Sequence, residues 1–292
     1  MTEPDDVVVG MVGLGNMGAA LAANLVGAGH PVVAHDAAGP ERAPEGSTPV
    51  ADVAEVARRA DVVVLSLPDG TASGSVVDEV LAVAVADRRA ALVIDTSTIG
   101  VAAAQELAAR LVAEGIGHVD APVSGGVAGA RARTLAVMYA GTDESCAAAA
   151  EVLAGLSDRR VRVGDRAGLA QAVKLANNFL SATALLAASE AVAFATSVGV
   201  EMATVLEVVN SSSGQSAATS DKFPNHVLTG RYSSGFSNSL MAKDVGLYLG
   251  EVTGAGGPAT MGETVADLWA RFAVAEPGAD FTRIYPWVCD DE

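Results

Sequence analysis

Lysine is scarce in this chain, and so is positive charge as a whole. The 292 residues include three lysines and 15 arginines, against 35 aspartates and glutamates, so the formal net charge is −17. A nucleic-acid partner would require clustered cations to neutralise its phosphates. The charge balance therefore argues against nucleic-acid binding and favours a soluble protein that acts on a small molecule.

Cysteine, histidine and aromatic residues are also few. The two cysteines, Cys146 and Cys289, are far apart and lack the spacing of metal ligands, and the four histidines are scattered. We therefore expect no metal site and two reduced thiols, as in a cytoplasmic protein. Because only 4% of the residues are aromatic, the interior has to be packed mainly with Ala, Val and Leu.

Long apolar runs are missing as well. No uninterrupted apolar run reaches the ~18 residues that a membrane-spanning helix requires. The first residues, MTEPDD, are acidic where a signal peptide would be basic. We therefore expect a cytoplasmic protein with no membrane partner.

What the first half does contain is a regular alternation of short Val-rich runs and Ala-rich segments with helical period. This βα rhythm predicts an α/β fold with a doubly wound parallel sheet of the Rossmann type. We expect strands at 7–12, 31–35, 61–67, 91–95, 118–122, 134–141 and 159–164. We expect helices at 16–28, 51–59 and 101–113, and a further one that begins near Asp143.

The rhythm changes after the last expected strand. From 168 to 198 there is no proline, and Gly199 offers a C-cap, which predicts one long helix. Beyond it, helical patterns are broken by polar stretches without strand alternation. We expect two domains joined by the long helix: a Rossmann-type NAD-binding domain at 1–165 and an all-helical substrate and oligomerisation domain at 166–292. The long helix and abundant small residues also predict a homodimer or homotetramer.

The segment GLGNMG, directly after the first expected strand and before a helical pattern, has the spacing Gly-x-Gly-x-x-Gly. In such a turn the first glycine allows a tight bend, the second lets the backbone approach a pyrophosphate, and the third permits close helix–strand packing. A tight turn without a ligand is the alternative. We expect a dinucleotide to bind at Gly13, Leu14, Gly15, Asn16, Met17 and Gly18.

The end of the second expected strand indicates which dinucleotide binds. Asp36 follows Gly18 by 18 residues, where a carboxylate can accept hydrogen bonds from the adenosine ribose hydroxyls. The same carboxylate would repel a 2′-phosphate, and the nearest arginine is Arg42. We therefore predict NAD rather than NADP. A role of Asp36 as a turn cap is compatible with this prediction.

The stretch GLAQAVKLANNFL, 168–180, places a lysine in an otherwise apolar run. On a helix, Lys174 and Asn178 lie one turn apart on the same face. An ammonium in a partly buried cleft loses hydration, which lowers its pKa toward values useful for proton transfer, whereas arginine stays protonated. A lysine that snorkels to the surface of an interdomain helix is the alternative.

Four blocks of sequence resemble the β-hydroxyacid dehydrogenase family, which includes 3-hydroxyisobutyrate dehydrogenase. They are VGLGNMGAALAANL at the glycine turn, DAPVSGGVAGARARTLAVMYAG at 120–141, GLAQAVKLANNFL at 168–180, and FSNSLMAKDVGLYL at 236–249. The blocks cover nearly the whole chain in the family's order. The resemblance is specific to the family and not to one substrate.

The resemblance implies roles for individual residues. Lys174 is implied as the catalytic acid/base and Asn178 as a substrate-binding residue. Ser124, Gly125 and Gly126 match the segment that binds the substrate carboxylate, and a hydroxyl with successive glycine N–H groups suits an anion; a flexible glycine loop is the alternative. Cofactor contacts are implied for Leu67, Pro68, Thr98 and Lys243. Lys222 receives no role.

Two departures from the family pattern concern the same blocks. Ala170 stands where the family often has a second glycine, and Arg133 follows Ala132 where a glycine is common. Arg131 and Arg133 lie shortly after the carboxylate loop. They would either serve an unusually anionic substrate or be surface arginines.

These observations predict an NAD-dependent dehydrogenase that oxidises a small β-hydroxy acid to its semialdehyde, or catalyses the reverse reduction. The acid and the physiological direction stay open. An imine reductase on the same scaffold is one alternative, but there a different residue is expected at the lysine position. A non-catalytic dinucleotide-binding protein is the other, and Lys174 with Asn178 and the 124–126 loop speaks against it.

Overall fold

The computed structural model describes residues 7–290. The chain divides into two compact units, of which the first ends at Lys174 and the second begins at Leu175. The division falls within the long helix α8, Leu169–Ser197. The domain boundary expected from the sequence, between 165 and 166, lies shortly before this helix. We call the two parts the sheet unit and the helical unit.

The sheet unit is built on a nine-stranded sheet, in the order β3-β2-β1-β4-β5-β6-β8-β7, with β9 paired to β8. Neighbours from β3 to β6 run parallel, whereas β8 runs antiparallel to β6 and β7. The expected doubly wound parallel sheet is therefore present, with an antiparallel extension at one edge. The strands are β1 Val9–Val12, β2 Val32–His35, β3 Thr48–Pro49, β4 Val62–Leu65, β5 Leu92–Asp95, β6 Gly117–Asp120, β7 Val123–Ser124, β8 Ala136–Ala140 and β9 Arg159–Gly164.

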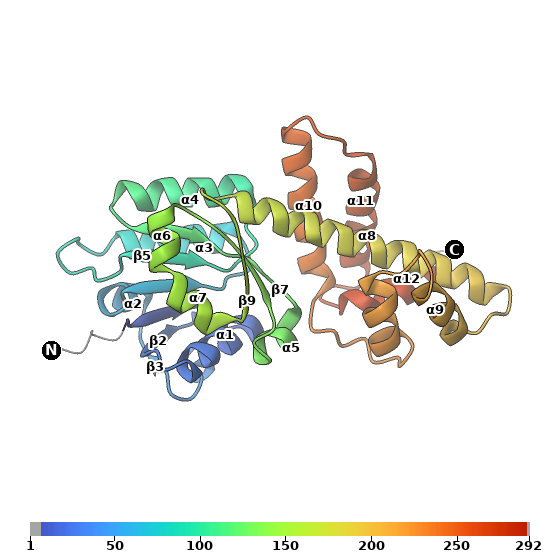
Figure 1. The fold of residues 1–292 in the computed structure, drawn as a ribbon, viewed down its shortest axis with the longest axis horizontal. Coiled ribbons are helices and arrows are strands. Elements are labelled where there is room, and N and C mark those ends of the chain that lie inside the picture. Colours follow the sequence, from blue (N-terminus) through green and yellow to red (C-terminus); the bar gives the residue numbers. More distant parts are fainter. Residues whose placement is uncertain (1–6, 291–292) are drawn as a thin grey trace. The chain divides into compact units, whose positions relative to one another are not determined.

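Helices cover both faces of this sheet (Figure 1). One hydrophobic cluster joins the sheet to α1, α5, α6 and α7, and a second joins the opposite face to α2, α3 and α4. Strands β1, β4 and β5 contribute alternate residues to the two clusters, as burial on both faces requires. The helices are α1 Asn16–Gly27, α2 Val53–Arg59, α3 Gly70–Leu81, α4 Val101–Ala113, α5 Gly126–Arg131, α6 Asp143–Ala148 and α7 Ala150–Leu156.

The order of the strands fixes where a ligand can bind. The chain leaves β1 toward β2 on one side and later enters β4 on the other side of β1. Ligands of open α/β sheets bind at such a switch point, beyond the carboxyl ends of the strands. The glycine turn directly follows Val12, the last residue of β1.

Helix α8 ends as the sequence predicts. Gly199 has φ of +97°, and the N–H groups of Gly199 and Val200 donate to the carbonyls of Thr196 and Ala195. This arrangement satisfies carbonyls of the last turn. By length and mean hydropathy α8 would also be able to cross a membrane, with 28% of its most apolar window buried. One such helix is weak evidence for a membrane span, since helices of soluble proteins pass the same test.

The helical unit packs around large aromatic side chains. It contains both tryptophans and all six phenylalanines of the sequence. Trp269, Phe223 and Phe272 are fully buried in its core, and Trp269 contacts Phe272 edge to face. Besides the larger part of α8, it contains α9 Met202–Asn210, the π-helical segment η2 Ala218–Val227, α10 Asn238–Gly254, α11 Thr260–Ala275, the short η3 Phe281–Arg283 and α12 Ile284–Asp290.

Candidate functional site

Of the three glycines of the turn after β1, two are required by the packing of the chain and the third faces open space. A Cβ on Gly13, whose φ is +90°, would lie 2.3 Å from the carbonyl oxygen of Ser66, and one on Gly18 would lie 1.9 Å from that of Gly13. These two glycines are required by the protein's own packing. Apart from the adjoining backbone, no atom of the described residues lies within 4 Å of a Cβ built on Gly15, and the φ of −62° at Gly15 suits any residue. The chain itself therefore sets no requirement for glycine at this position, and the space beside it is open to a ligand.

The first turn of α1 has the features of an anion site. Gly15 is its N-cap, and no side chain of the described residues caps the helix, so its first N–H groups point outward unpaired. A cavity of about 500 Å³ opens beside this turn, with two arginines in its wall. Its lining residues are Leu14, Gly15, Asn16, Ala19, Ala20, Ala23, Arg42 and Arg131.

Asp36 lies at the same turn. Its carboxylate accepts hydrogen bonds from the N–H groups of Leu14, at 2.6 Å, and Ala38, at 2.8 Å, and Arg42 Nε lies 3.9 Å away. Partial burial opposes ionisation, but these two N–H groups and Arg42 hold the pKa of Asp36 below its usual value. The carboxylate is thus charged at neutral pH and fixed beside the glycine turn, where the prediction requires a ribose acceptor.

Loops after β4 and β5 bring the next predicted cofactor residues to the same edge of the sheet. The N–H of Leu67 donates to Ser97 Oγ at 2.9 Å, so the two loops are joined directly. Pro68 is exposed, and Thr98 is half-buried between two buried neighbours. Both parallel strands end at this edge, as the register of β4 with β5 requires.

The predicted carboxylate loop links β7 to α5. Ser124 ends β7 opposite Ala136 of β8. Gly125 and Gly126 have φ of +131° and +67°, values that favour glycine. The sequence SGG therefore makes a bend that other residues would strain, which is the local geometry the carboxylate prediction requires.

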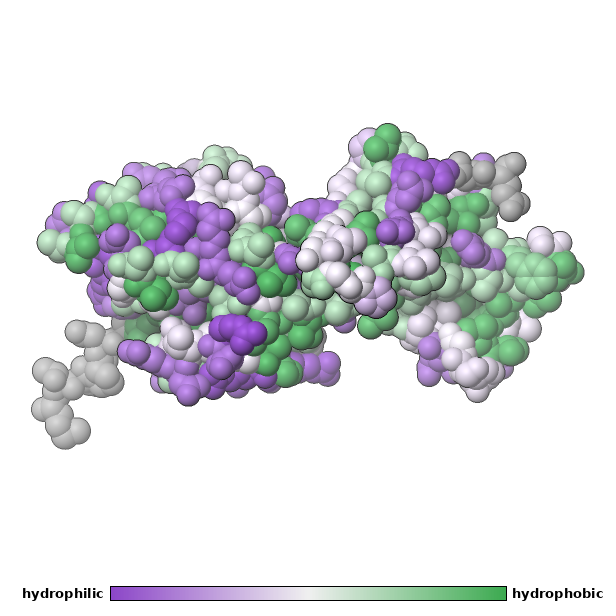
Figure 2. All heavy atoms as spheres, turned by 90° about the horizontal axis from the view of Figure 1, so that it is seen from above, coloured by the Kyte–Doolittle hydropathy of each residue, from purple (hydrophilic) through white to green (hydrophobic). Residues whose placement is uncertain are grey.

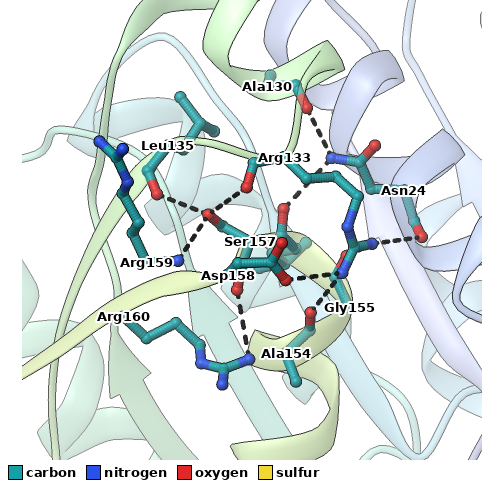
Figure 3. A network of polar contacts seen from close by, with 11 residues as sticks. Asn24, Ala130, Arg133, Leu135, Ala154, Gly155, Ser157, Asp158, Arg159 and Arg160 are labelled. Carbon is teal, nitrogen blue, oxygen red and sulfur yellow. Dashed lines mark hydrogen bonds and ion pairs between the residues drawn. The ribbon is translucent and has the colours of Figure 1, made fainter.

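Arg133 belongs to a structural network (Figure 3). Its guanidinium donates to the carbonyls of Ala154 and Gly155, at 2.8 and 2.7 Å, and so caps the end of α7. Its own carbonyl accepts from Ser157 Oγ at 3.1 Å. The side chain of Asn24 ties α1 to the carbonyl of Ala130 in the same network. Of the two arginines after the carboxylate loop, Arg133 thus braces the sheet unit, and Arg131 lines the cavity at the glycine turn.

Lys174 lies in the second turn of α8 and is only 7% exposed. The start of this helix is fastened by Gln171, one turn earlier, whose side chain is completely buried. Gln171 Nε2 donates to Asp120 Oδ1 at 2.7 Å and to the carbonyl of Ser97 at 3.0 Å. Neither Gln171 nor Asp120 had a predicted role. Each is a polar residue between apolar sequence neighbours, and this is the one feature of the sequence from which they could have been singled out.

Asp120 anchors the same turn through its second oxygen. Oδ2 accepts from the N–H groups of Gly168 and Gln171, at 3.0 and 3.1 Å. Burial raises the pKa of Asp120 to about 6 against these hydrogen bonds, and the neighbouring Asp95 adds to the rise. The carboxylate of Asp120, far away in the sequence, thus caps the beginning of α8. The residue that directly precedes the helix, Gly168, has no side chain that could do so.

Within the helical unit, the two residues predicted to bind substrate and cofactor share a carboxylate. Asn178 Nδ2 donates to Asp244 Oδ2 at 2.6 Å, and Lys243 Nζ lies 3.1 Å from Asp244 Oδ1. Asn178 is 5% exposed and Asp244 is 2% exposed. A buried charge needs such partners, so Asp244 holds both side chains in place.

Lys222, which had no predicted role, has a structural one. Its Nζ lies 2.6 Å from Asp221 Oδ2, and Asn225 Nδ2 donates to Asp221 Oδ1 at 2.9 Å. This exposed trio has the same chemical groups as the Asp244 trio, but its carboxylate is half exposed. Solvent therefore weakens its bonds, and within 7–290 the side-chain bonds of the trio join its members to one another.

The fold and the glycine turn define a Rossmann-type dinucleotide-binding protein. Within residues 7–290, no three His, Cys, Asp or Glu side chains are grouped as metal ligands. The family model described as the NAD binding domain of 6-phosphogluconate dehydrogenase matches 8–164. The model described as NAD-binding of NADP-dependent 3-hydroxyisobutyrate dehydrogenase matches 168–288.

Curated relatives and solved structures match along the whole chain. A Mycobacterium tuberculosis protein described as "Probable 3-hydroxyisobutyrate dehydrogenase" is 37% identical, over 94% of this chain and 96% of its own. The human mitochondrial 3-hydroxyisobutyrate dehydrogenase is 32% identical, over 97% and 87%. The structure of the M. tuberculosis 3-hydroxyisobutyrate dehydrogenase with L-serine superposes with a TM-score of 0.89 at 34% identity, covering 97% and 99% of the two chains.

The chain belongs to the β-hydroxyacid dehydrogenase family. It is a hydroxyacid dehydrogenase with a nicotinamide dinucleotide cofactor, as the resemblance of its four sequence blocks implied. The roles of the individual residues, the substrate and the choice between NAD and NADP stay predictions.

Proposed function

We propose that this protein oxidises a small β-hydroxy acid related to 3-hydroxyisobutyrate to its semialdehyde with NAD, or catalyses the reverse reduction, with Lys174 as the acid/base. The burial of Lys174 is the observation that carries the proposal. A lysine is almost never buried without a specific reason. Lys174 is also the single lysine of α8, in a chain that has three lysines against 15 arginines.

The residues at the carboxyl edge of the sheet fit a nicotinamide dinucleotide. The space beside Gly15 and the uncapped start of α1 suit its pyrophosphate, and Asp36 suits a ribose. When bound, the cofactor supplies the hydride acceptor or donor of the reaction. We propose that the turn Gly13–Gly18, Asp36, Leu67, Pro68, Thr98 and Lys243 hold it.

The substrate would be held by its carboxylate and its hydroxyl. Ser124 and the N–H groups of Gly125 and Gly126 bind the carboxylate. Lys174, as a neutral amine, accepts the hydroxyl proton while the hydride leaves the same carbon, so the C–O bond becomes a carbonyl. Asn178 orients the hydroxyl. In the reduction, the Lys174 ammonium returns the proton to the oxygen.

Preference for NAD is the part of the proposal that Asp36 supports. Its pKa is lowered, so the carboxylate is charged at neutral pH and would repel a 2′-phosphate. Arg42, 3.9 Å from Asp36, already has that carboxylate as its partner. A higher kcat/KM with NADP than with NAD would contradict this assignment.

A panel of substrates tests the function. NAD reduction is followed with 3-hydroxyisobutyrate, 3-hydroxypropionate, glycerate, L-serine, threonate and sulfonate analogues, and the semialdehydes are assayed with NADH. L-serine belongs in the panel because it is a β-hydroxy acid and appears with the M. tuberculosis structure. We expect turnover with at least one compound. Tight NADH binding without turnover of any compound would contradict the proposal and favour a non-catalytic dinucleotide-binding protein.

We also propose that the chain forms a homo-oligomer, through α8. Val173, Leu180 and Phe194 are spaced by multiples of seven residues, so they follow one face of α8, and Val198 directly follows the last residue of the helix. They are 44%, 66%, 71% and 67% exposed. Purple, hydrophilic residues predominate on the sheet unit in Figure 2, whereas white and green ones predominate on the helical unit. A row of exposed apolar side chains is typical of an interface between subunits.

Light scattering tests this second proposal. We expect a dimer or tetramer, and a smaller mass for the variant Phe194→Glu. Val274→Glu, at an even more exposed apolar position on α11, is the matched control and should leave the mass unchanged. A monomeric wild-type chain would contradict the proposal. The cytoplasmic location and the absence of nucleic-acid and membrane partners remain predictions.

A further inference from the structure

The side chain of Gln171 uses its full hydrogen-bonding capacity inside the protein. Both N–H groups of Nε2 are donated, to Ser97 and Asp120, and Oε1 accepts from the backbone N–H groups of Ile99, at 2.9 Å, and Gly100, at 3.2 Å. The side chain is completely buried. An amide is the one uncharged side chain that offers two donors and two acceptors in a plane. Glutamate in this position would direct a second carboxylate at Asp120.

These four bonds join segments that are far apart in the sequence. They connect the first turn of α8 with the loop after β5 and with the carboxyl end of β6, over separations of 51 to 74 residues. Through Ser97 Oγ, which accepts from the N–H of Leu67, the same set reaches the loop after β4. Buried networks that are fully paired are rigid, because a small displacement leaves several groups unpaired.

Each segment carries one of the residues assigned to the reaction. Lys174 follows Gln171 by three residues, Thr98 lies between two residues that bond to Gln171, and Ser124 follows Asp120 by four residues. Catalysis by proton transfer requires these groups in a fixed geometry, and a misplacement of about 1 Å can lower the rate by about 100-fold. A side chain that joins all three segments therefore controls the geometry of the reaction without touching the substrate.

We propose that Gln171 is a positioning residue, whose bonds to Asp120 and to the loop 97–100 fix Lys174 in register with the segments of Thr98 and Ser124. This inference rests on the proposed function, since it assigns Gln171 to the reaction of Lys174. A purely structural role predicts lower stability with normal turnover per folded molecule. A positioning role predicts lower turnover in molecules that still fold and bind the cofactor.

The test compares variants of the full chain. Gln171→Met keeps the length of the side chain and removes all four bonds, and Gln171→Asn keeps the amide but shortens its reach. Gln105→Met is the matched control, because Gln105 is exposed on α4 and has no side-chain hydrogen bond within the described residues. For each variant we measure kcat, KM for the hydroxy acid, the NADH dissociation constant, and the solvent isotope effect on kcat in D2O. Amide hydrogen exchange is followed at 97–100 and 168–174.

In Gln171→Met we expect kcat per NADH-binding site to fall by about 100-fold, with a smaller change in KM and little change in NADH affinity. The solvent isotope effect should rise, because proton transfer with Lys174 becomes slower relative to other steps. Gln171→Asn should lie between this variant and the wild type, and Gln105→Met should match the wild type. Normal kcat per NADH-binding site in both Gln171 variants would overturn the inference, whatever their stability.

The exchange measurement separates the two proposals. If the wild type turns over no compound of the panel, the proposed function fails, and hydrogen exchange alone decides on Gln171. Faster exchange at both 97–100 and 168–174 in Gln171→Met would support the coupling of these segments, and so would the same result in Gln171→Asn if the Met variant does not fold. Unchanged exchange in one of the two segments would overturn it.

Discussion

Two buried aspartates, one in each unit, bond to amide side chains of α8 on either side of Lys174. In the sheet unit, Asp120 accepts from Gln171, three residues before the lysine. In the helical unit, Asp244 accepts from Asn178, four residues after it. The two bonds are alike in chemistry and burial. They differ in what else the carboxylate binds.

Asp120 has uncharged partners and Asp244 has a cation. The other bonds to Asp120 come from two backbone N–H groups, so its whole surrounding is fixed by the fold. Asp244 pairs with Lys243, whose side chain is 26% exposed and can reach a ligand. The comparison teaches that the first bond serves to fix the helix, whereas the second holds two side chains that are themselves proposed to bind ligands.

The largest effect is expected from the lysine between the two bonds. Lys174→Arg keeps the charge but cannot give up its proton, so kcat should fall by about 10²- to 10⁴-fold with little change in NADH affinity. Lys222→Arg is the control, since Lys222 pairs with the half-exposed Asp221 and has no proposed role in the reaction. Steady-state kinetics with the best acid of the panel decides. Near-normal turnover of Lys174→Arg would remove the acid/base assignment.

The next effect tests the bond in the helical unit. Asn178→Ala removes the amide that donates to Asp244 and is proposed to orient the substrate, so kcat/KM should fall by about 10- to 100-fold, from the loss of about 1–3 kcal/mol. Unlike Gln171→Met, this variant should raise KM as well as lower kcat. Asn225→Ala breaks the exposed amide–carboxylate bond to Asp221 and should have no effect. If Asn178→Ala and Gln171→Met changed kcat and KM by the same factors, the two bonds would not differ in function as proposed.

Two buried residues of β6, His118 and Asp120, should make the free energy of unfolding of the protein depend on pH in opposite directions. Burial lowers the pKa of His118 from 6.5 to about 4, so between these values the native state binds fewer protons than the unfolded state. Its contribution to the free energy of unfolding therefore falls as pH decreases through this window. Asp120, with a pKa raised from 3.8 to about 6, contributes in the opposite sense and loses stability as pH rises through that range.

The variant His118→Leu isolates the histidine. Relative to the wild type, it should gain about 2 kcal/mol of unfolding free energy at pH 5 compared with pH 7.5, because the cost of leaving His118 neutral is removed. Urea unfolding of both proteins at pH 5 and at pH 7.5 gives the difference in unfolding free energy between variant and wild type at each pH. The contribution of Asp120 cancels in this difference, since both proteins contain it. Equal differences at pH 5 and 7.5 would show that His118 does not titrate in this way.

The smallest effect concerns a third aspartate, Asp36, which is held by backbone N–H groups like Asp120 but lies at the glycine turn. Asp36→Asn removes the charge that repels a 2′-phosphate, so the ratio of kcat/KM for NAD to that for NADP should fall by about tenfold, or 1.4 kcal/mol. Asp52→Asn changes an exposed helix cap of α2 and serves as the control. An unchanged ratio would mean that Asp36 only holds the turn.

Most of the fold could be predicted because its signals are local. The expected helix at 101–113 coincides with α4, and the expected strand at 91–95 contains β5. The antiparallel direction of β8 was not predictable, since it depends on pairing with β6 and β7. The π-helical turns of η2 have no periodic signature in a segment that contains Pro224.

The candidate site divides in the same way. The glycine turn and Asp36 could be found because the phosphate-binding pattern has fixed spacing within one βαβ unit. Gln171 and Asp120 could not be paired from the sequence, because 51 residues separate them and no spacing rule relates them. Asp244 directly follows Lys243 in one of the four sequence blocks. Its bond to Asn178 could not be predicted, because 66 residues separate the two and only the folded chain brings them together.

The open space beside Gly15 makes it possible to separate folding from ligand binding in one residue. Since no side chain of the described residues approaches that position and its backbone angles suit alanine, Gly15→Ala should give a folded protein with a methyl group at the place proposed for the pyrophosphate. The difference in thermal stability between the wild type with saturating cofactor and this variant under the same conditions would then measure what cofactor binding adds to the stability of the fold.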